Sequence, residues 1–385
     1  MRISYIIPHK NRNGILEMHL KALKNSVFND YEIIVVDDGS DVIPDCAVRN
    51  EKWDGPGGAR SYGASLAKGD IIMFVGDDTL PSEDLLLWHW FTHRTNPDVD
   101  VVQGYTMFHP SVLGTYFMQF LDSSGFQANW KSLKNDDGSW KRDASGFFLT
   151  TNVSIKKKSW DRIGEFSPKF NRAAWEDVEF GVRLQRNFFK TIFEPSATNF
   201  HLHGYTYQEF CERQKVEGYE RLNVCLEHAE MAPTLIQPEM LRNMNQVAEI
   251  EVLNNGARIA NMNIPDFRKV QENLWGEGLQ IMSLIGLSHA INDRGGMFNV
   301  FKHLHTPEEI VMCISAIRAI EKGDYGYAQH CKVWLLDKTK NDWAVFAFTT
   351  EIDLASNDAE SARMNWTKAN KLAPDEEWIR WLRGI

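Results

Sequence analysis

The stretch IIMFVGDDT at residues 71–79 decides the fold, because a short apolar run leads there directly into two adjacent carboxylates. The apolar run has the length and composition of a buried β-strand. Burying Asp77 and Asp78 beside such a strand is costly unless a cation or hydrogen-bond donors compensate their charge. The arrangement therefore predicts a metal site at the end of a strand. The ordinary alternative is a solvated turn in which aspartate serves as a turn former.

Size and composition describe a globular protein with room for two domains. The chain has 385 residues, of which 43% are hydrophobic and 24% are charged. Its formal net charge of −10 argues against general binding to nucleic acid or anionic membranes, because both rely on basic surface. Five cysteines without a CxxC pair or zinc spacing favour free thiols in a reducing compartment. With no signal peptide and no transmembrane run, we expect a cytoplasmic protein, either free or peripheral to a membrane.

Two further predicted strands end in residues that suit ligand binding. A first apolar run ends at Pro8, leucines at helical spacing follow, and a second apolar run ends in DDGS at residues 37–40. The order strand, helix, strand predicts a parallel pair, and open sheets of this kind bind ligands at the carboxyl ends of strands. Asp37 and Asp38 could accept hydrogen bonds there from a ribose or a base. A simple Asp-Gly turn is the alternative.

A glycine-rich loop, GPGGARSYGA at residues 55–64, opens a predicted helix of small residues. The backbone N–H groups at the start of this helix, with Arg60 beside them, suit a pyrophosphate. The alternative is a flexible turn, since such a loop is weak evidence alone. It does not fit the dinucleotide fingerprint, because no Gly-x-Gly-x-x-Gly follows the first strand.

Together these elements resemble the GT-A glycosyltransferases of family 2. The resemblance covers roughly residues 1–220. It rests on the first strand ending in Pro8 and on the motifs VVDDGS (35–40), GARSYG (58–63), AKGD (67–70) and GDD (76–78). It implies an α/β domain of the GT-A type, which is a Rossmann-like, mostly parallel sheet flanked by helices.

The resemblance implies a nucleotide-sugar donor site in the first part of the chain. Asp37 or Asp38 would contact the nucleobase and the ribose of the donor, with Pro8 and Arg60 also on the donor side. The interval between the second strand and the glycine-rich loop, residues 41–54, looks too short for the second helix and following strand that the family has there.

The resemblance also implies a metal motif. The family's Asp-x-Asp motif, which holds a divalent cation bridging the two phosphates, aligns with residues 76–78. Glycine stands at its first acidic position here, so coordination would rest on Asp78, and Asp77 would lie nearer the ribose or the sugar. The family's Ala-Arg-Asn also departs here to Ala-Arg-Ser, at residues 59–61.

An interval rich in polar and aromatic residues, 104–146, separates the expected donor half, residues 1–103, from the next motif. We expect it to begin the acceptor half, residues 104–234. Trp130 and Trp140 in this interval could stack on a sugar ring of the acceptor, although packing in a core or a lid is the commoner use of tryptophan.

The sequence AWEDVEF at residues 174–180 predicts a helix that opens with an acidic pair. The helix dipole favours such a pair, which is the ordinary explanation for it. In the resembled family, Trp-Glu-Asp opening a helix marks the acceptor site, with Trp175 beside it. By this resemblance Asp177 would deprotonate the acceptor hydroxyl and Glu176 would bind the acceptor.

Two histidines follow in an alternating segment, residues 198–203, which predicts that His201 and His203 project from one side of a strand. An isolated histidine is most often an ordinary hydrogen-bonded side chain. The resembled family adds a histidine to the metal site after the acceptor helix, which favours His201 as that ligand, with His203 as the substitute. An imidazole beside carboxylate and phosphate oxygens fits Mn²⁺ better than Mg²⁺, the two cofactors considered.

Beyond the first domain, residues 1–234, only amphipathic helical patterns are found, so residues 235–385 form an expected all-α region. Asp324 and Asp358 begin similar segments 34 residues apart, which is the tetratricopeptide period. Two such units are fewer than a free-standing array needs. We therefore expect them to brace the catalytic domain or to form a homo-oligomer, in preference to recruiting a separate protein.

The leading hypothesis is an inverting, metal-dependent hexosyltransferase of polysaccharide biosynthesis, acting by single displacement. It would transfer a sugar from a nucleoside-diphosphate sugar, with UDP favoured, to a hydroxyl of a glycan or related acceptor. One alternative is a catalytically degenerate domain that acts as a scaffold through its helical tail, as Gly76 would suit. Another is a sugar-1-phosphate nucleotidyltransferase, which is less similar because PHKN at residues 8–11 replaces its glycine- and arginine-rich loop.

Overall fold

The computed structural model describes residues 1–52, 55–238, 240, 268–339, 342–373 and 375–382. Within these residues the chain forms two compact units, which divide between Tyr207 and Gln208. This division lies earlier in the chain than the predicted domain boundary after residue 234. Residues 241–267 of the expected helical region lie outside the described residues.

The first unit is built on one eight-stranded sheet with the order β3-β2-β1-β4-β7-β6-β8-β5. Its strands are β1 (Ile3–His9), β2 (Tyr31–Asp37), β3 (Ala47–Arg49), β4 (Ile71–Val75), β5 (Thr79–Pro81), β6 (Val101–Phe108), β7 (Asn152–Lys156) and β8 (Thr191–His201). β1 lies between β2 and β4 and runs parallel to both, whereas β7 is antiparallel to β4 and β6. A mixed sheet of this kind, with flanking helices, confirms the predicted GT-A-like fold class.

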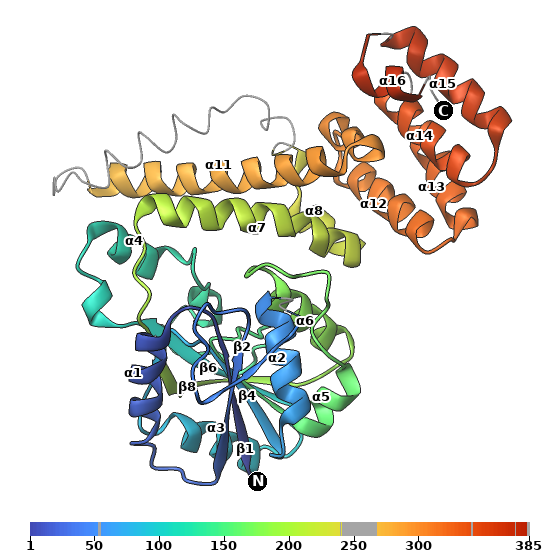
Figure 1. Ribbon diagram of the computed structural model, residues 1–385. Coiled ribbons are helices and arrows are strands. Elements are labelled where there is room, and N and C mark those ends of the chain that lie inside the picture. Colours follow the sequence, from blue (N-terminus) through green and yellow to red (C-terminus); the bar gives the residue numbers. More distant parts are fainter. Residues whose placement is uncertain (53–54, 239, 241–267, 340–341, 374, 383–385) are drawn as a thin grey trace. The chain divides into compact units, whose positions relative to one another are not determined.

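Helices cover both faces of this sheet (Figure 1). One face carries α1 (Asn13–Leu23) and α3 (Leu85–Thr95), and the other carries α2 (Gly55–Leu66), α5 (Lys157–Ile163) and α6 (Glu176–Arg186). The central strand β4 explains why both faces are covered. Its residues alternate between two cores, with Met73 packing towards α1 and α3, and Phe74 towards α2, α5 and α6. All of β4 is fully buried, so its sequence is continuously apolar rather than alternating.

The short strand β3 corrects one expectation. The interval 41–54 looked too short for a helix and a strand, yet Ala47–Arg49 pairs in parallel with β2. The chain reaches this register without a helix between β2 and β3. The strand is short and only half-buried at its ends, so its sequence carries too little apolar pattern to predict it.

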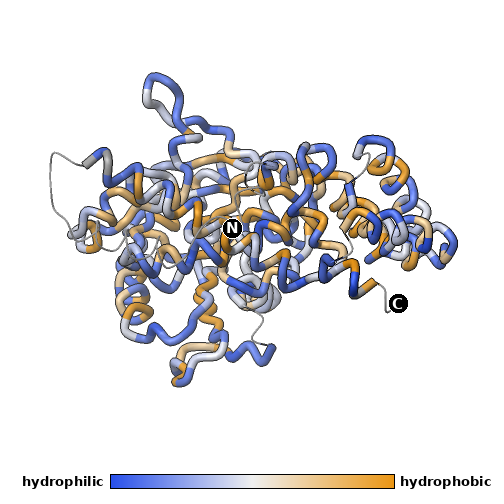
Figure 2. Tube along the Cα trace, turned by 90° about the horizontal axis from the view of Figure 1, so that it is seen from above, coloured by the Kyte–Doolittle hydropathy of each residue, from blue (hydrophilic) through white to orange (hydrophobic). Residues whose placement is uncertain are grey.

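The second unit is helical throughout its described part. Its helices are α7 (Tyr207–Glu227), α8 (Ala232–Leu235), α11 (Arg268–Arg294), α12 (Pro307–Glu321), α13 (Tyr325–Lys338), α14 (Trp343–Ala355), α15 (Ala359–Leu372) and α16 (Glu377–Leu382), with 3₁₀ turns at Ala229–Met231 and Gly296–His303. Hydrophobic and hydrophilic residues alternate along the C-terminal helices, as expected of helices that each bury one face (Figure 2). None of the described helices is long and apolar enough to cross a membrane.

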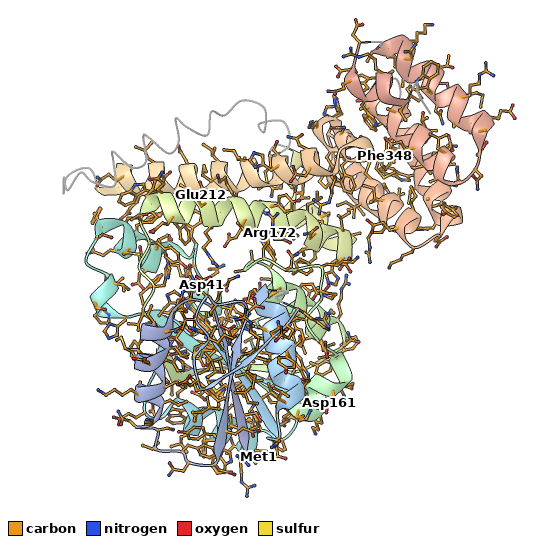
Figure 3. All side chains as sticks on the ribbon, in the orientation of Figure 1. Met1, Asp41, Asp161, Arg172, Glu212 and Phe348 are labelled. Atoms are coloured by element: carbon orange, nitrogen blue, oxygen red, sulfur yellow. The ribbon has the colours of Figure 1, made fainter. Side chains whose placement is uncertain are left out.

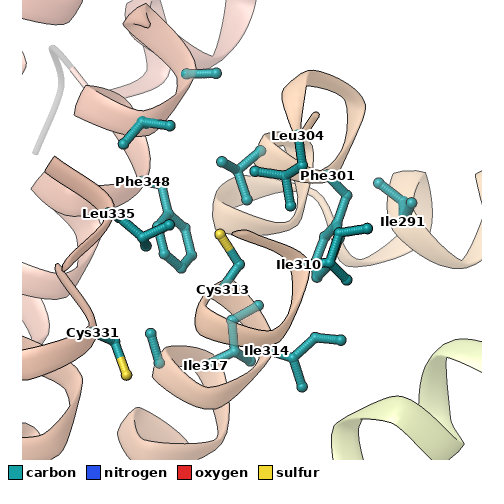
Figure 4. Close-up of a cluster of buried hydrophobic side chains, with 14 of the residues drawn as sticks. Ile291, Phe301, Leu304, Ile310, Cys313, Ile314, Ile317, Cys331, Leu335 and Phe348 are labelled. Atoms are coloured by element: carbon teal, nitrogen blue, oxygen red, sulfur yellow. The ribbon is translucent and has the colours of Figure 1, made fainter. Parts of the chain in front are cut away.

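One hydrophobic cluster holds this unit together (Figure 4). It runs from Leu222 on α7 and Ile291 on α11 to Phe348 on α14 and Leu382 on α16. The C-terminal helices therefore share a core with α7, α8 and α11. They are not a separately packed module.

The two segments 34 residues apart adopt the same local structure. Asp324 accepts a hydrogen bond from Tyr327 N at the start of α13, and Asp358 accepts one from Ser361 N at the start of α15. A residue with positive φ precedes each cap, glycine at 323 and asparagine at 357. The chain thus repeats one helix-turn-helix arrangement. Its assignment to the tetratricopeptide class stays a prediction.

Candidate active site

The candidate site residues gather at the carboxyl ends of the parallel strands in the first unit. Figure 3 shows Met1 at one end of this unit and Asp41 and Arg172 at the opposite end. Asp41 follows β2, and the carboxyl ends of β1 and β4 lie beside it because both strands run parallel in adjacent positions. This is the edge at which open α/β sheets bind ligands.

Asp77 and Asp78 follow β4, are buried, and are paired with His9 at the end of β1 and with Arg12 in the loop after it. Arg12 Nη1 donates to Asp77 Oδ1 at 3.0 Å and to Asp78 Oδ2 at 2.9 Å. His9 Nδ1 donates to Asp77 Oδ2 at 2.9 Å. Both oxygens of Asp77 are thereby engaged by protein groups, whereas Asp78 shares only Oδ2 with Arg12 in these contacts. The two carboxylates at this strand end therefore have compensating partners, as the sequence required. The sequence did not indicate that Arg12 and His9 would be among these partners.

His9 connects the two acidic motifs of the expected donor site. Its ring binds Asp77, and its backbone oxygen accepts a hydrogen bond from Asp38 N at 2.9 Å. Its Nε2 lies 2.8 Å from Asn13 Oδ1, so both ring nitrogens face oxygen acceptors. Burial lowers the pKa of His9, but the hydrogen bonds with Asp77 and Asn13 outweigh it and raise that pKa above the ordinary value.

His201 lies beside Asp78 because of strand register. β5 pairs antiparallel with β8 through Thr79 and His201, and Leu202 N donates to Asp78 O. His201 Nε2 is consequently 3.7 Å from Asp78 Oδ2. Burial would raise the pKa of Asp78, but the charges of His201 and Arg12 outweigh burial and lower it.

His203 does not share the strand position that its spacing predicted. β8 ends at His201, so His203 lies in the segment beyond it, with its ring centroid 6.2 Å from that of His201 and 4.3 Å from that of Tyr205. His201 Nε2 lies within ion-pair distance of Asp78, and the charge of His203 also acts to lower the pKa of Asp78.

The contacts of Asp78 allow a test of whether the site suits a divalent cation. Among the described residues, no group of three or more His, Cys, Asp or Glu side chains has the arrangement of a metal cage. Asp78 Oδ2 and His201 Nε2 nevertheless present one oxygen and one nitrogen 3.7 Å apart. That pair fits a cation which draws its remaining ligands from substrate phosphates and water, as Mg²⁺ and Mn²⁺ do in nucleotide sites.

The glycine at position 76 removes a carboxylate from the predicted metal motif, and it also leaves space that the Asp78 side chain occupies. A Cβ at this position would lie 2.7 Å from Asp78 Oδ1. An acidic residue in place of Gly76 would therefore require the Asp78 carboxylate to move. The glycine permits the present orientation of Asp78, in which Oδ2 faces Arg12 and His201.

Asp37 and Asp38 are held by residues at the end of β3. Arg49 donates to Asp37, and Asn50 Nδ2 donates to Asp38 Oδ1 at 3.1 Å. Burial would raise the pKa of Asp37, but hydrogen bonds from Ser40 and Arg49 outweigh it and lower that pKa. Asp37 is an ionised acceptor fixed in place. Arg49 and Asn50 were missed from the sequence because they follow a strand too short to recognise.

Pro8 occupies the expected position at the end of β1. It is paired in register with Val36 of β2, one residue before His9 meets Asp37. The residues that follow Pro8 therefore reach the site, whereas Pro8 itself lies within the paired part of β1 and β2.

Arg60 joins the glycine-rich helix to the acceptor motif. Arg60 Nη1 donates to Glu176 Oε1 at 3.0 Å, and both side chains are buried. A Cβ at Gly57 would lie 3.5 Å from Glu176 Cβ, and one at Gly55, whose φ is +82°, would lie 2.2 Å from Asn171 O. The glycines of α2 thus permit close packing against the segment before α6. Arg60 contacts an acceptor-side carboxylate, a partner that its donor-side prediction did not include.

The acidic helix start at α6 has the predicted form. Trp175 precedes the helix with φ +67°, and α6 begins at Glu176. Asp177 is half-buried, and its Oδ1 accepts a hydrogen bond from Val178 N at 2.8 Å. Left-handed backbone at a tryptophan is strained, and such strain is commonest at functional sites.

Trp130 and Trp140 lie together in a small aromatic cluster. Both pack on Tyr105, at 5.2 Å between ring centroids, and on Phe193, at 5.6 Å for Trp130 and 5.1 Å for Trp140. The cluster also includes buried Leu133. These contacts are of the core-packing kind, and they bring the two tryptophans together at the interval between β6 and β7.

The sequence of the first unit matches a known protein family. Residues 4–167 match the family model described as glycosyl transferase family 2. The match begins in β1 and ends just before α6, so it contains the Asp37, Arg60 and Asp78 motifs. The matched residues lie within the first unit, and the match agrees with the resemblance found from the sequence.

The chain is also similar to individual glycosyltransferases. It is 28% identical over 235 residues to hyaluronan synthase of Pasteurella multocida, over 49% of this chain and 24% of that protein. It is 33% identical over 200 residues to the GalNAc(5)-diNAcBac-PP-undecaprenol beta-1,3-glucosyltransferase of Campylobacter jejuni, over 48% of this chain and 57% of that protein. The chain therefore spans less than two thirds of either relative. A solved mannosyltransferase of Pyrobaculum calidifontis, in complex with GDP-Man and Mn²⁺, has a TM-score of 0.48 at 17% identity, covering 76% of this chain and 88% of that chain.

Proposed function

We propose that this chain is an inverting glycosyltransferase that moves a sugar from a nucleoside-diphosphate sugar to a hydroxyl group of a glycan or related acceptor. The observation that carries the proposal is the double contact of His9. Its backbone binds the motif of Asp38, and its ring binds Asp77, so two acidic motifs from different strands form one surface. A donor with a base and ribose at one end and a diphosphate at the other matches a site of that extent.

The donor end of this site is fixed before any ligand binds. Asp37 is ionised and fully buried, and it is held by Arg49 and Ser40, so a ribose or a base N–H that reaches it would meet a carboxylate already fixed in position. Asp38 is held by Asn50 in the same way. Uracil is the base we favour, and its N3–H could donate to such a fixed carboxylate.

A divalent cation would be held by Asp78 and His201, where it would neutralise negative charge on the departing nucleoside diphosphate. Mn²⁺ suits the nitrogen ligand better than Mg²⁺. The chain's own residues act at the same place, since Arg12 binds both Asp77 and Asp78 and His9 donates a hydrogen bond to Asp77. Asp77, with both oxygens engaged, orients these groups.

At the acceptor end, we propose that the Asp177 carboxylate takes the proton of the attacking hydroxyl as the acceptor oxygen bonds to the anomeric carbon. The bond from that carbon to the diphosphate oxygen breaks in the same displacement, so no covalent enzyme intermediate is formed. Glu176, held by Arg60, binds acceptor hydroxyls, and Trp175 lies beside it at the helix start. Trp130 and Trp140 are candidates for contact with a sugar ring further along an acceptor.

A donor panel tests this function. The full-length protein is incubated with UDP-, GDP- and ADP-sugars and MnCl₂, with and without oligosaccharide acceptors, and the released products are measured. Release of nucleoside diphosphate that needs MnCl₂ and stops in excess chelator is expected. Release of pyrophosphate from nucleoside triphosphate and sugar 1-phosphate would instead identify a nucleotidyltransferase. Binding of neither donor nor nucleoside diphosphate would favour a scaffold.

A further inference from the structure

Arg12 occupies the position at which a cation would meet Asp78. Its Nη1 atom bonds Asp78 Oδ2 at 2.9 Å, and this is the same oxygen that lies 3.7 Å from His201 Nε2. The oxygen that a divalent cation would share with His201 is therefore already bonded to a guanidinium. The Asp77 oxygen bonded by the same Nη1 is Oδ1, at 3.0 Å.

The backbone on both sides of Arg12 is anchored, whereas its side chain is held only at its tip by the two carboxylates and is partly exposed. His9 is tied to Asp77, and Asn11 N donates to Ser40 Oγ at 2.9 Å, while Asn11 also exchanges hydrogen bonds with Asp41. The carbonyl of Arg12 accepts hydrogen bonds from the first turn of α1. Its side chain is 39% exposed and makes no cap for that helix. The guanidinium is thus aimed at the carboxylates by a fixed backbone, and it can turn away into solvent.

Charge balance at Asp78 implies that Arg12 and a divalent cation would compete for its carboxylate. His9 offsets Asp77 with a hydrogen bond to Oδ2, so Asp78 relies on Arg12 and His201. A divalent cation on Asp78 would place two like charges on one carboxylate oxygen, which is unfavourable at such short separations. Lys10, the neighbouring basic residue, is exposed and provides a matched position in the same loop.

We propose that Arg12 is a resident cation of this site, which competes with the divalent cation for Asp78 and yields it when a nucleoside diphosphate supplies a new anionic partner. The proposal rests on the proposed function, since it concerns the same donor site. Its consequence is ordered loading: the free protein binds the metal weakly, and nucleotide and metal strengthen each other's binding. Such coupling is reciprocal by thermodynamic necessity.

The test measures binding of MnCl₂ alone by calorimetry, without donor and without turnover. Arg12→Met should bind Mn²⁺ about tenfold tighter than the wild type, because a charge-assisted hydrogen bond no longer competes. Arg12→Lys should fall between the two, since lysine keeps the charge but not the planar fork. Lys10→Met is the matched control and should leave the Mn²⁺ affinity within about twofold of the wild type. The double variant Arg12→Met with Asp78→Asn should lose the gain, which locates the metal on Asp78.

A second arm adds UDP. Saturating UDP should raise the Mn²⁺ affinity of the wild type more than that of Arg12→Met, because the variant has no competing guanidinium to release. Mn²⁺ affinity in Arg12→Met equal to or below that of the wild type would overturn the proposal. An equal gain in Lys10→Met, or a gain that survives Asp78→Asn, would overturn it as well. A wild type that turns over no nucleotide-sugar refutes the proposed function and leaves this metal titration readable by itself. Melting curves check that each variant is folded, and Arg12→Gln gives a second neutral replacement.

Discussion

The buried guanidinium of Arg60 donates a hydrogen bond to the buried carboxylate of Glu176 at 3.0 Å, across the join between the glycine-rich helix and the acceptor motif. Arg60→Met removes this cation from a buried carboxylate and should destabilise the protein by on the order of 3 kcal/mol. Chemical denaturation measures the change. Arg60→Met combined with Glu176→Gln should lose less than Arg60→Met alone, because the buried negative charge is then absent. Lys157→Met, at an exposed ion pair on α5, is the matched control and should change stability little. Equal losses in the single and double variants would contradict a direct coupling.

Asp177→Asn tests the assignment of the general base. The amide keeps the size and the hydrogen bond with Val178 N but cannot accept the proton, so kcat should fall by about 10²- to 10⁴-fold with donor binding nearly unchanged. Steady-state kinetics and donor calorimetry provide the measurement. Glu176→Gln should instead raise mainly the acceptor KM. Asp161→Asn, an exposed aspartate on α5, is the control. If the acidic pair serves only the helix dipole, Asp177→Asn loses under about 1 kcal/mol of stability and keeps kcat near the wild-type value.

Glu351 in α14 should make the stability of the helical unit depend on pH. Burial raises its pKa from 4.5 to about 7, although hydrogen bonds from Trp378 and Met297 N act in the other direction. Between these values the folded state binds the proton that the unfolded state releases, so stability is highest at low pH and falls as pH rises through 7. The loss should be on the order of 2 kcal/mol.

Melting curves of the wild type and Glu351→Gln at pH 5 and pH 8 check this prediction. The glutamine variant should lose much less stability across that interval than the wild type. Glu360→Gln, an exposed residue at the start of α15, is the matched control and should behave as the wild type does. A wild type that is equally stable at both pH values, or a Glu351→Gln variant with the same slope, would contradict the assignment.

Removal of residues 307–385 should not leave an intact remainder. The core cluster joins Leu222 and Ile291 to residues beyond 307, including Phe348, so the truncation exposes apolar surface that is now buried. We expect aggregation, or a change of oligomeric state, in sedimentation experiments. A truncated protein that is monodisperse and retains its Mn²⁺ affinity would show that the tail is an independent module. Substituting exposed Val333 by serine in the full-length chain is a control that reduces surface hydrophobicity without opening the core.

The sequence predicted the parts of the site that follow from local pattern. Apolar runs ending in carboxylates placed Asp37 and Asp78 at strand ends, and the acidic helix start at Glu176 was recognised from its spacing. The sequence could not predict contacts between residues that lie far apart along the chain. Arg12 meets Asp78 across 66 residues and Arg60 meets Glu176 across 116, and such contacts depend on the whole sheet order.

Short or irregular segments were the other source of error. β3 has only Ala47–Arg49, so its apolar pattern was too brief to detect, and Arg49 was missed with it. His203 was assigned to a strand because the alternation continues past its true end at His201. Alternation of residue types indicates which side chains would lie on the same face of a strand. The end of the strand is set by where hydrogen bonding to the neighbouring strand stops.

The pairing of Thr79 with His201 limits which changes of chain length the site can tolerate. Because side chains alternate along β8, one inserted or deleted residue between Thr198 and His201 would turn His201 to the opposite face and bring a neighbour beside Asp78. Upstream, the β6 pairing jumps from Glu194 to Thr198, so residues 195–197 already form an irregularity that absorbs extra length. In aligned homologous chains, gaps should therefore collect in this irregularity and be absent from the few residues that follow it.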